Sequence, residues 1–222
     1  MPRQLWYHIK VAFRHLFWMP AIAMVGSFIV LRLARAASEL RFGYMLIVME
    51  VLAPPLDALL STAIISRENS EGTLELAITK VSLLRLFSLR FALVQAYMGL
   101  TILVVTFLFK QCYIAFDAFE IWFASFVSSF FLACLGSTLA NFSVNSNVGY
   151  IGAIAWWAVN LILQGLAQHP WFRYIYLFSR TLSFEESIWA ANKLTLLIAC
   201  VCLLGLNHLA LRHPERFILQ RL

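Results

Sequence analysis

The chain has 222 residues, of which 62% are hydrophobic and only 13% are charged. Soluble domains contain about 25% charged residues, so this composition argues against a soluble fold. The formal net charge is +6, but the basic residues lie between apolar runs, which is typical of membrane-interface anchors and argues against nucleic-acid binding. Cysteines and histidines form no CxxC, HxxxH or HExxH pattern, so we expect no metal site.

Residues 1–16 form an amphipathic stretch ahead of the first apolar run. Leu5, Ile9, Phe13 and Leu16 recur at helical spacing, while basic residues occupy other parts of the helix circumference. This pattern predicts a helix that lies in the membrane interface, with its basic side toward the lipid head groups.

Six apolar runs of about 20 residues follow, and each is long enough to cross the hydrocarbon core as a helix. We therefore predict an all-α membrane protein with six transmembrane helices, forming a single transmembrane domain over residues 1–222. The runs cover about residues 17–34, 43–65, 91–109, 118–140, 148–166 and 188–210.

An even number of spans places both termini on the same side of the membrane. The side that holds the termini and residues 66–90 carries ten of the 17 Lys and Arg residues, and the opposite side carries seven. Because positive residues favour the cytoplasm, we predict cytoplasmic termini in the cell (inner or plasma) membrane. Arg32, Arg35 and Arg41 in the first outer loop run against this bias.

The second run contains two acidic residues, Glu50 and Asp57, and a pair of prolines between them, Pro54 and Pro55. Acids seven residues apart share a helix face to within about 20°, and ionisable groups at this depth usually face protein or a water-filled cavity. The prolines remove backbone donors and predict a kink. Two interpretations remain open, the polar wall of a substrate pathway or a structural kink whose acids pair with neighbouring helices.

Residues 66–90 form the longest charged stretch of the chain. Glu68, Glu71 and Glu75 are spaced by three and four residues, so they can share one face of a helix, and Gly72 can turn the chain sharply. One interpretation is a short amphipathic helix in which Leu74 enters a groove of a soluble partner while the carboxylates contact its rim. The alternative is a charged hairpin that only links the second and third spans.

The segment directly after the second run resembles the hallmark of ABC-2 type transporter permeases. It reads Glu71-Gly72-Thr73-Leu74-Glu75-Leu76-Ala77-Ile78-Thr79. The resemblance implies that two six-span subunits pair, that each docks on a cytosolic ABC ATPase, and that this segment is the coupling element. It assigns ATPase coupling to Glu68, Glu71, Gly72, Thr73, Leu74 and Glu75. Family members often have a proline where this chain has Lys80, so the turn that leaves the coupling helix is expected to differ.

No GxxxxGK[ST] phosphate-binding loop occurs in the chain, so ATP and Mg²⁺ are expected on the partner ATPase. We therefore expect a transport subunit without catalytic residues or a cofactor of its own. The resemblance implies an exporter permease that moves a hydrophobic or amphipathic molecule such as a peptide, lipid or drug. Two alternatives remain, a heme-exporter B-type subunit of cytochrome maturation and a six-span substrate-binding subunit of a vitamin importer.

The fifth run contains Asn160 and Gln164, four residues apart on one predicted helix face. These amides either hydrogen-bond across a helix interface or contact substrate, so we treat them as pathway candidates. In the fourth run, Gly136 and Ala140 form a small-xxx-small pair that allows two helices to approach closely.

Residues 167–187 form an aromatic loop on the expected outer side. Leaving its aromatic side chains in water would be costly, so we predict an interfacial or re-entrant segment that packs at the outer membrane face. This segment either gates the pathway or only anchors the chain. The outer-gate candidates are Trp171, Phe172, Tyr174, Tyr176 and Phe178.

Overall fold

The computed structural model describes residues 18–33, 43–71, 82–112, 116–167, 169–181 and 185–212. Within these ranges the chain is helical and contains no strand, which confirms the predicted all-α class. The predicted interfacial helix at residues 1–16 and the coupling residues Gly72, Thr73, Leu74 and Glu75 lie outside the described residues. The elements are α2 (Trp18–Leu33), the π-helix η1 (Ile47–Leu52), α4 (Ala53–Glu71), α6 (Leu83–Cys112), α7 (Ala118–Ser143), α8 (Ser146–Ile162), the 3-10 helices η2 (Gln164–Leu166) and η3 (Phe172–Tyr174), and α9 (Glu186–Leu211).

Four of the described helices are long and apolar enough to cross a membrane, and α2 is a shorter apolar helix. These helices are what a membrane-embedded protein requires. The helix α8 has 17 residues and ends at Ile162, before the predicted end of the fifth run. The four long segments are Gly43–Ile64, Leu83–Gln111, Ala118–Ser143 and Glu186–Leu211.

The helix α6 begins at Leu83, eight residues before the predicted start of the third run at residue 91. Hydropathy alone predicts a loop in this first part, because it contains two basic residues, Arg85 and Arg90. In the structure Arg90 is only 1% exposed, and its guanidinium donates to the carbonyl oxygen of Ile64 at 3.5 Å. The early start of α6 therefore depends on a contact with α4 that hydropathy does not show.

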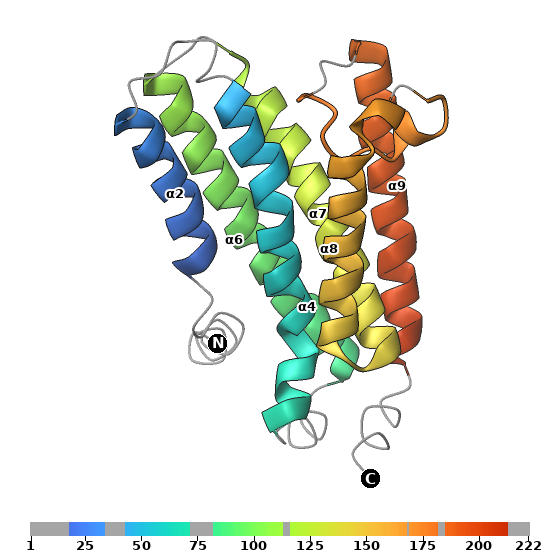
Figure 1. Cartoon of the computed structure of the whole chain (residues 1–222). Coiled ribbons are helices and arrows are strands. Elements are labelled where there is room, and N and C mark those ends of the chain that lie inside the picture. The colour runs from blue at the N-terminus through green and yellow to red at the C-terminus, as the bar shows by residue number, and fades with distance from the viewer. Residues whose placement is uncertain are drawn as a thin grey trace.

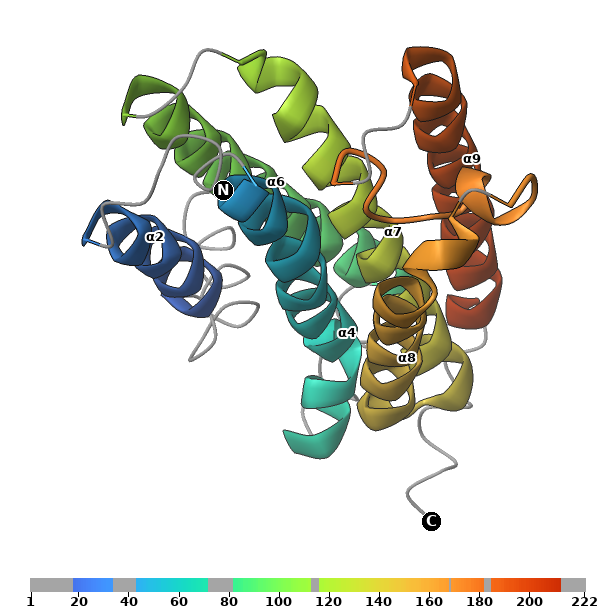
Figure 2. The ribbon, with the colours of Figure 1, turned by 45° about the horizontal axis from the view of Figure 1, so that its top comes forward.

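The helix α7 lies at the centre of the bundle and packs against α4, α6, α8 and α9 (Figures 1 and 2). Helices approach one another closely where small residues line their contact. Much of the buried surface of α7 is made of small residues: Ala124, Ser125, Ser128, Ser129, Ala133, Gly136, Ser137 and Ala140. Small side chains therefore let one central helix contact four neighbours.

The closest approach joins α4, α7 and α8 at two glycines, Gly136 and Gly149. A Cβ atom on Gly149 would lie 2.8 Å from the Cβ of Ala140 and closer still to the carbonyl oxygen of Gly136 and the methyl group of Thr62. A Cβ atom on Gly136 would lie 2.7 Å from the hydroxyl of Thr62. The small pair predicted on α7 is thus used for close packing, and Gly149 is the partner that the sequence pattern did not identify.

The two prolines lie in the first turn of α4, directly after the π-helix η1. Because η1 and α4 form one continuous helical segment, each proline leaves a carbonyl oxygen of the preceding turn without its N–H partner. In a regular α-helix, the N–H at position 55 would bond to the carbonyl oxygen of Val51, and Pro55 has no N–H. The indole N–H of Trp157 on α8 donates to that oxygen at 2.8 Å instead. The π-helical turn before the prolines and the hydrogen bond from Trp157 therefore accommodate the two prolines within the helical segment.

We predict that Gly149→Ala destabilises the protein by about 1–3 kcal/mol, because the new methyl group overpacks the contact of α4, α7 and α8. Gly205→Ala is the matched control, because a Cβ atom at this position on α9 meets nothing within 4 Å. Thermal unfolding of the purified variants in detergent measures the difference. Equal midpoints for Gly149→Ala and the wild type would show that the helices are not in close contact there.

Candidate functional site

The connection between α8 and α9 enters the helix bundle instead of running over its surface. We define the α8–α9 connection as the described residues 169–181. Tyr176, Leu177, Phe178 and Ser179 are completely buried in it. In Figure 1 the connection lies at the upper end of the bundle, above α8 and beside the upper part of α9. A buried segment that is not a regular helix must find partners for its backbone N–H and C=O groups.

The five aromatic gate candidates occupy different environments in this connection. Trp171 is 82% exposed, Phe172 and Tyr174 are partly buried, and Tyr176 and Phe178 are fully buried. The rings of Tyr176 and Phe178 meet edge to face, with centroids 5.6 Å apart. Burial, and after it the negative charge of Glu50, raises the pKa of Tyr176 to about 12. The phenol is therefore neutral at physiological pH.

Polar side chains from three helices bind the backbone in the middle of the connection. Asn160 on α8 accepts a hydrogen bond from the N–H of Leu177 at 3.0 Å, and Ser128 on α7 donates to the carbonyl oxygen of Leu177 at 2.7 Å. The amide nitrogen of Asn192 on α9 donates to the carbonyl oxygens of Arg173 at 2.8 Å and Tyr176 at 2.9 Å. These bonds replace the water that a surface loop would use.

Glu50 binds the end of the connection from the π-helix η1. Its carboxylate has no exposed surface and accepts bonds from the N–H of Arg180 at 3.1 Å and from the N–H and hydroxyl of Thr181, both at 2.8 Å. Hydrogen bonds to an ionised acceptor are roughly twice as strong as neutral ones. In this structure Glu50 therefore contacts protein, which corresponds to the structural interpretation that the sequence left open.

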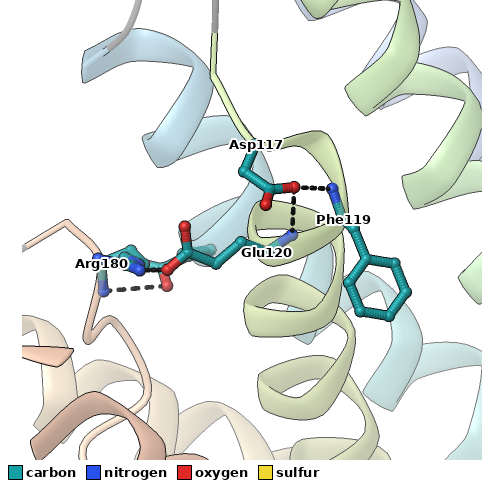
Figure 3. A network of polar contacts seen from close by, with 5 residues as sticks. Asp117, Phe119, Glu120 and Arg180 are labelled. Carbon is teal, nitrogen blue, oxygen red and sulfur yellow. Dashed lines mark hydrogen bonds and ion pairs between the residues drawn. The ribbon is translucent and has the colours of Figure 1, made fainter. Parts of the chain in front are cut away.

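Arg180 joins the connection to α7 and α9. Its guanidinium forms an ion pair with Glu120 on α7 (Figure 3) and lies over the ring of Trp189 on α9, 4.8 Å from the ring centroid. The carboxylate of Asp117 caps α7 by accepting from the N–H groups of Phe119 at 2.9 Å and Glu120 at 3.3 Å (Figure 3). This cap fixes the first turn of α7, and with it the position of the carboxylate that holds Arg180.

Lys193 is a buried cation on α9, within the predicted sixth run, and it is one of the seven basic residues that were counted for the outer side. It is 1% exposed, and its ammonium group donates to the hydroxyl of Ser128 at 3.0 Å. Since Ser128 also binds the backbone of Leu177, Lys193 supports the connection indirectly. The sequence feature that could have identified Lys193 is its position inside a predicted apolar run, because a charge at such a depth usually has a specific partner.

Asp57 forms a separate polar group between α4 and α6. One carboxylate oxygen, Oδ1, accepts from the amide nitrogen of Gln95 at 2.9 Å and from the hydroxyl of Ser61 at 3.1 Å. The amide nitrogen of Gln95 also lies 3.0 Å from the hydroxyl of Ser61. Both proline side chains lie in the turn before Asp57, with Pro54 buried and Pro55 partly buried.

The structure does not bring Asn160 and Gln164 together on one helix face. The helix α8 ends at Ile162, and Gln164 begins the 3-10 helix η2 with an exposed side chain, whereas Asn160 is buried. The four-residue spacing placed both amides on one α-helix, but this rule ceases to apply where the helix ends. Only Asn160 contacts the connection.

A cavity of about 270 Å³ lies between α6 and α9, away from the predicted pathway residues. Its lining includes Phe87, Phe91, Asn207 and His208. Asn207 is held there by Asn141, whose amide donates to it at 2.7 Å, and it donates to Thr138 at 2.8 Å. In the described part of the chain, no group of three or more His, Cys, Asp or Glu residues is arranged to hold a metal ion.

The predicted coupling residues are only partly described. Glu68 and Glu71 belong to the last turn of α4, which ends at Glu71. Comparisons of the chain with protein-family models, curated proteins and solved structures find no match. The function therefore has to be inferred from the sequence motif and from the geometry of the bundle.

We predict that Glu50→Gln loosens the α8–α9 connection. The NH2 group of the new glutamine side chain would lie beside the backbone N–H groups that the carboxylate now accepts from, and the charge-assisted bonds would be lost. Losing such bonds costs about 1.5–3 kcal/mol, so opening of the connection should become about 10- to 100-fold more frequent. A cysteine at buried Ser179, in a chain without its native cysteines, reports opening through its rate of reaction with a thiol reagent. The control Glu185→Gln, at an exposed position outside the connection, should leave the rate unchanged. Equal rates in the two variants would contradict the role of Glu50.

Proposed function

We propose that this chain is the membrane-spanning permease subunit of an ATP-binding-cassette exporter. It crosses the cell membrane six times, has both termini in the cytoplasm, and couples to a separate cytosolic ATPase. Together with a second six-span subunit it forms the pathway for a hydrophobic or amphipathic cargo. ATP and Mg²⁺ bind to the partner chain.

The observation that carries this proposal is the acidic segment that follows α4. The end of α4, the start of α6 and the end of α9 lie at the same end of the bundle (Figure 1). The segment from Gly72 to Thr79 therefore connects two helices at that end, and Glu68 and Glu71 precede it in the last turn of α4. A soluble partner that approaches this end is expected to contact the carboxylates and leucines of this segment.

The two ends of the bundle differ in the way a coupled permease requires. The helix α4, which the acidic segment follows in the sequence, ends at one end of the bundle, and the α8–α9 connection lies at the other end (Figure 1). Coupling needs a mechanical link between such ends, and the continuous helical segment from Gly43 to Glu71 supplies one. It carries Glu50, which binds the connection, and it ends at the acidic segment.

The six-span topology is supported by the lengths of the two shorter helices. The helices α2 and α8 have 16 and 17 residues, which at 1.5 Å per residue corresponds to roughly 25 Å. This length approaches the hydrocarbon thickness of about 30 Å. With the four long helices they make six crossings, an even number that places both termini together.

We predict that the double variant Glu71→Lys/Glu75→Lys reduces recovery of a cytosolic ABC ATPase at least about tenfold. The variant places lysines where carboxylates are proposed to contact the partner's rim. Like charges that are brought together at an interface cost several kcal/mol. Quantitative copurification from membranes measures the effect. The matched control is Glu185→Lys/Glu186→Lys, a pair of exposed acids at the opposite end of the bundle. Unchanged recovery of the ATPase in the coupling variant, or no ATPase with the wild type, would refute the proposal.

We also predict that the intact complex contains two permease subunits, because two ATPases must close around ATP and each requires its own docking segment. The exposed surfaces of α8 and α9 are apolar and include Ile151, Ile162, Ile198 and Val201. Native mass spectrometry of the detergent-solubilised complex counts the copies. A complex with a single six-span chain would contradict this stoichiometry.

A further inference from the structure

Asp57 is a fully buried acid whose two carboxylate oxygens have different surroundings. Oδ1 accepts hydrogen bonds from Gln95 and Ser61. Oδ2 contacts no hydrogen-bond donor among the described residues. The amide oxygen of Gln95, Oε1, is also buried and without a donor there. Two acceptors that lack a donor thus belong to side chains already joined by a hydrogen bond.

Among the described residues, the surroundings of Asp57 supply no counter-charge for an ionised carboxylate. On α6, Arg90 donates to the carbonyl oxygen of Ile64, about two turns along α4 from Asp57. On α7 the neighbouring titratable group is Cys134, and on α8 the titratable side chain is Tyr150, beside the Gly149 contact with Thr62. Lys193 donates to Ser128 at the α8–α9 connection. An unpaired buried carboxylate is very unfavourable, so such a group neutralises instead.

Glu50 shows by contrast how a buried acid with donors on both oxygens is surrounded in this bundle. Three donors bind its two oxygens, two of them backbone N–H groups. A protonated acid, which has an O–H donor of its own, needs fewer donors and an additional acceptor. Asp57 and Gln95 fit this second pattern.

We propose that Asp57 is a proton-binding site, and that a single proton on Oδ2 pairs the acid with the amide oxygen of Gln95. The amide would then donate to one acid oxygen while the acid donates back to the amide, so both unpaired acceptors are satisfied by one proton. The neutral pair joins α4 to α6 in the middle of the bundle. Removing the proton leaves both buried acceptors without a donor, which weakens the α4–α6 contact. The site is independent of the proposed transport function, because it requires neither the ATPase nor the second subunit.

The chain offers a direct test because it contains only two aspartates, Asp57 and Asp117. Asp117 is exposed, and its carboxylate accepts two backbone N–H bonds at the start of α7, so it provides an internal reference for the ionised form. Protein labelled with carbon-13 at the aspartate carboxyl groups is placed in lipid nanodiscs. Infrared and NMR spectra at neutral pH should show one protonated and one ionised carboxyl. Two ionised carboxyls would overturn the proposal.

Variants and salts then distinguish a proton from another cation. Asp57→Asn mimics the protonated acid without binding a proton, so it should fold, lose the protonated signal and be more stable than the wild type at neutral pH, where the wild type has to take up a proton to fold. Folding of the wild type should take up a proton, so its folding equilibrium constant should fall by up to about tenfold per pH unit as the pH rises from mildly acidic to alkaline. The same slope should be reduced in Asp57→Asn and unchanged in Asp117→Asn. Failure of Asp57→Asn to fold, or stabilisation of the wild type by sodium over choline that Asp57→Asn abolishes, would contradict proton binding.

Discussion

The fold depends on satisfying the backbone of a non-helical segment inside an apolar helix bundle. In such surroundings an unpaired N–H or C=O group costs several kcal/mol, which is why irregular backbone is accepted only where protein supplies the partners. Here η1, α7, α8 and α9 each contribute a polar side chain to the α8–α9 connection, namely Glu50, Ser128, Asn160 and Asn192. Four elements that are distant in sequence are therefore fixed relative to one another by the same short segment.

The same constraint explains the charged side chains at this end of the bundle. Arg180 neutralises Glu120 and is covered by the ring of Trp189, while Lys193 binds the hydroxyl that holds Leu177. A partly exposed ion pair is weak evidence for stability because desolvation and solvent screening offset the attraction. Such charges instead make the position of the connection specific, since only one arrangement of the segment satisfies all of them.

The continuous helical segment from Gly43 to Glu71 relates the two ends of the molecule. It binds the connection through Glu50, joins α6 through Asp57, and packs tightly on α7 and α8 at Thr62. With 29 residues at a rise near 1.5 Å, it is about 40 Å long. Its close packing makes a displacement at the acidic end difficult to absorb locally, because packed interiors transmit strain. This segment is the physical basis for coupling in the proposed function.

The sequence by itself determined which runs are helical, because run length and hydropathy are properties of the chain alone, but not where α6 begins or α8 ends. Glu50, Asp57 and Asn160 were recognised in advance as unusual, because polar groups inside apolar runs need partners. Their partners could not be predicted, since helical periodicity gives the face of a residue but does not identify the neighbouring helix. Arg90 and Lys193 were assigned to topology although both are buried, and Gln164 was placed on a helix that ends two residues earlier. Only the tertiary structure decided these positions, because each depends on a contact between helices: Arg90 with Ile64, Lys193 with Ser128, and Glu50 with the backbone of Thr181.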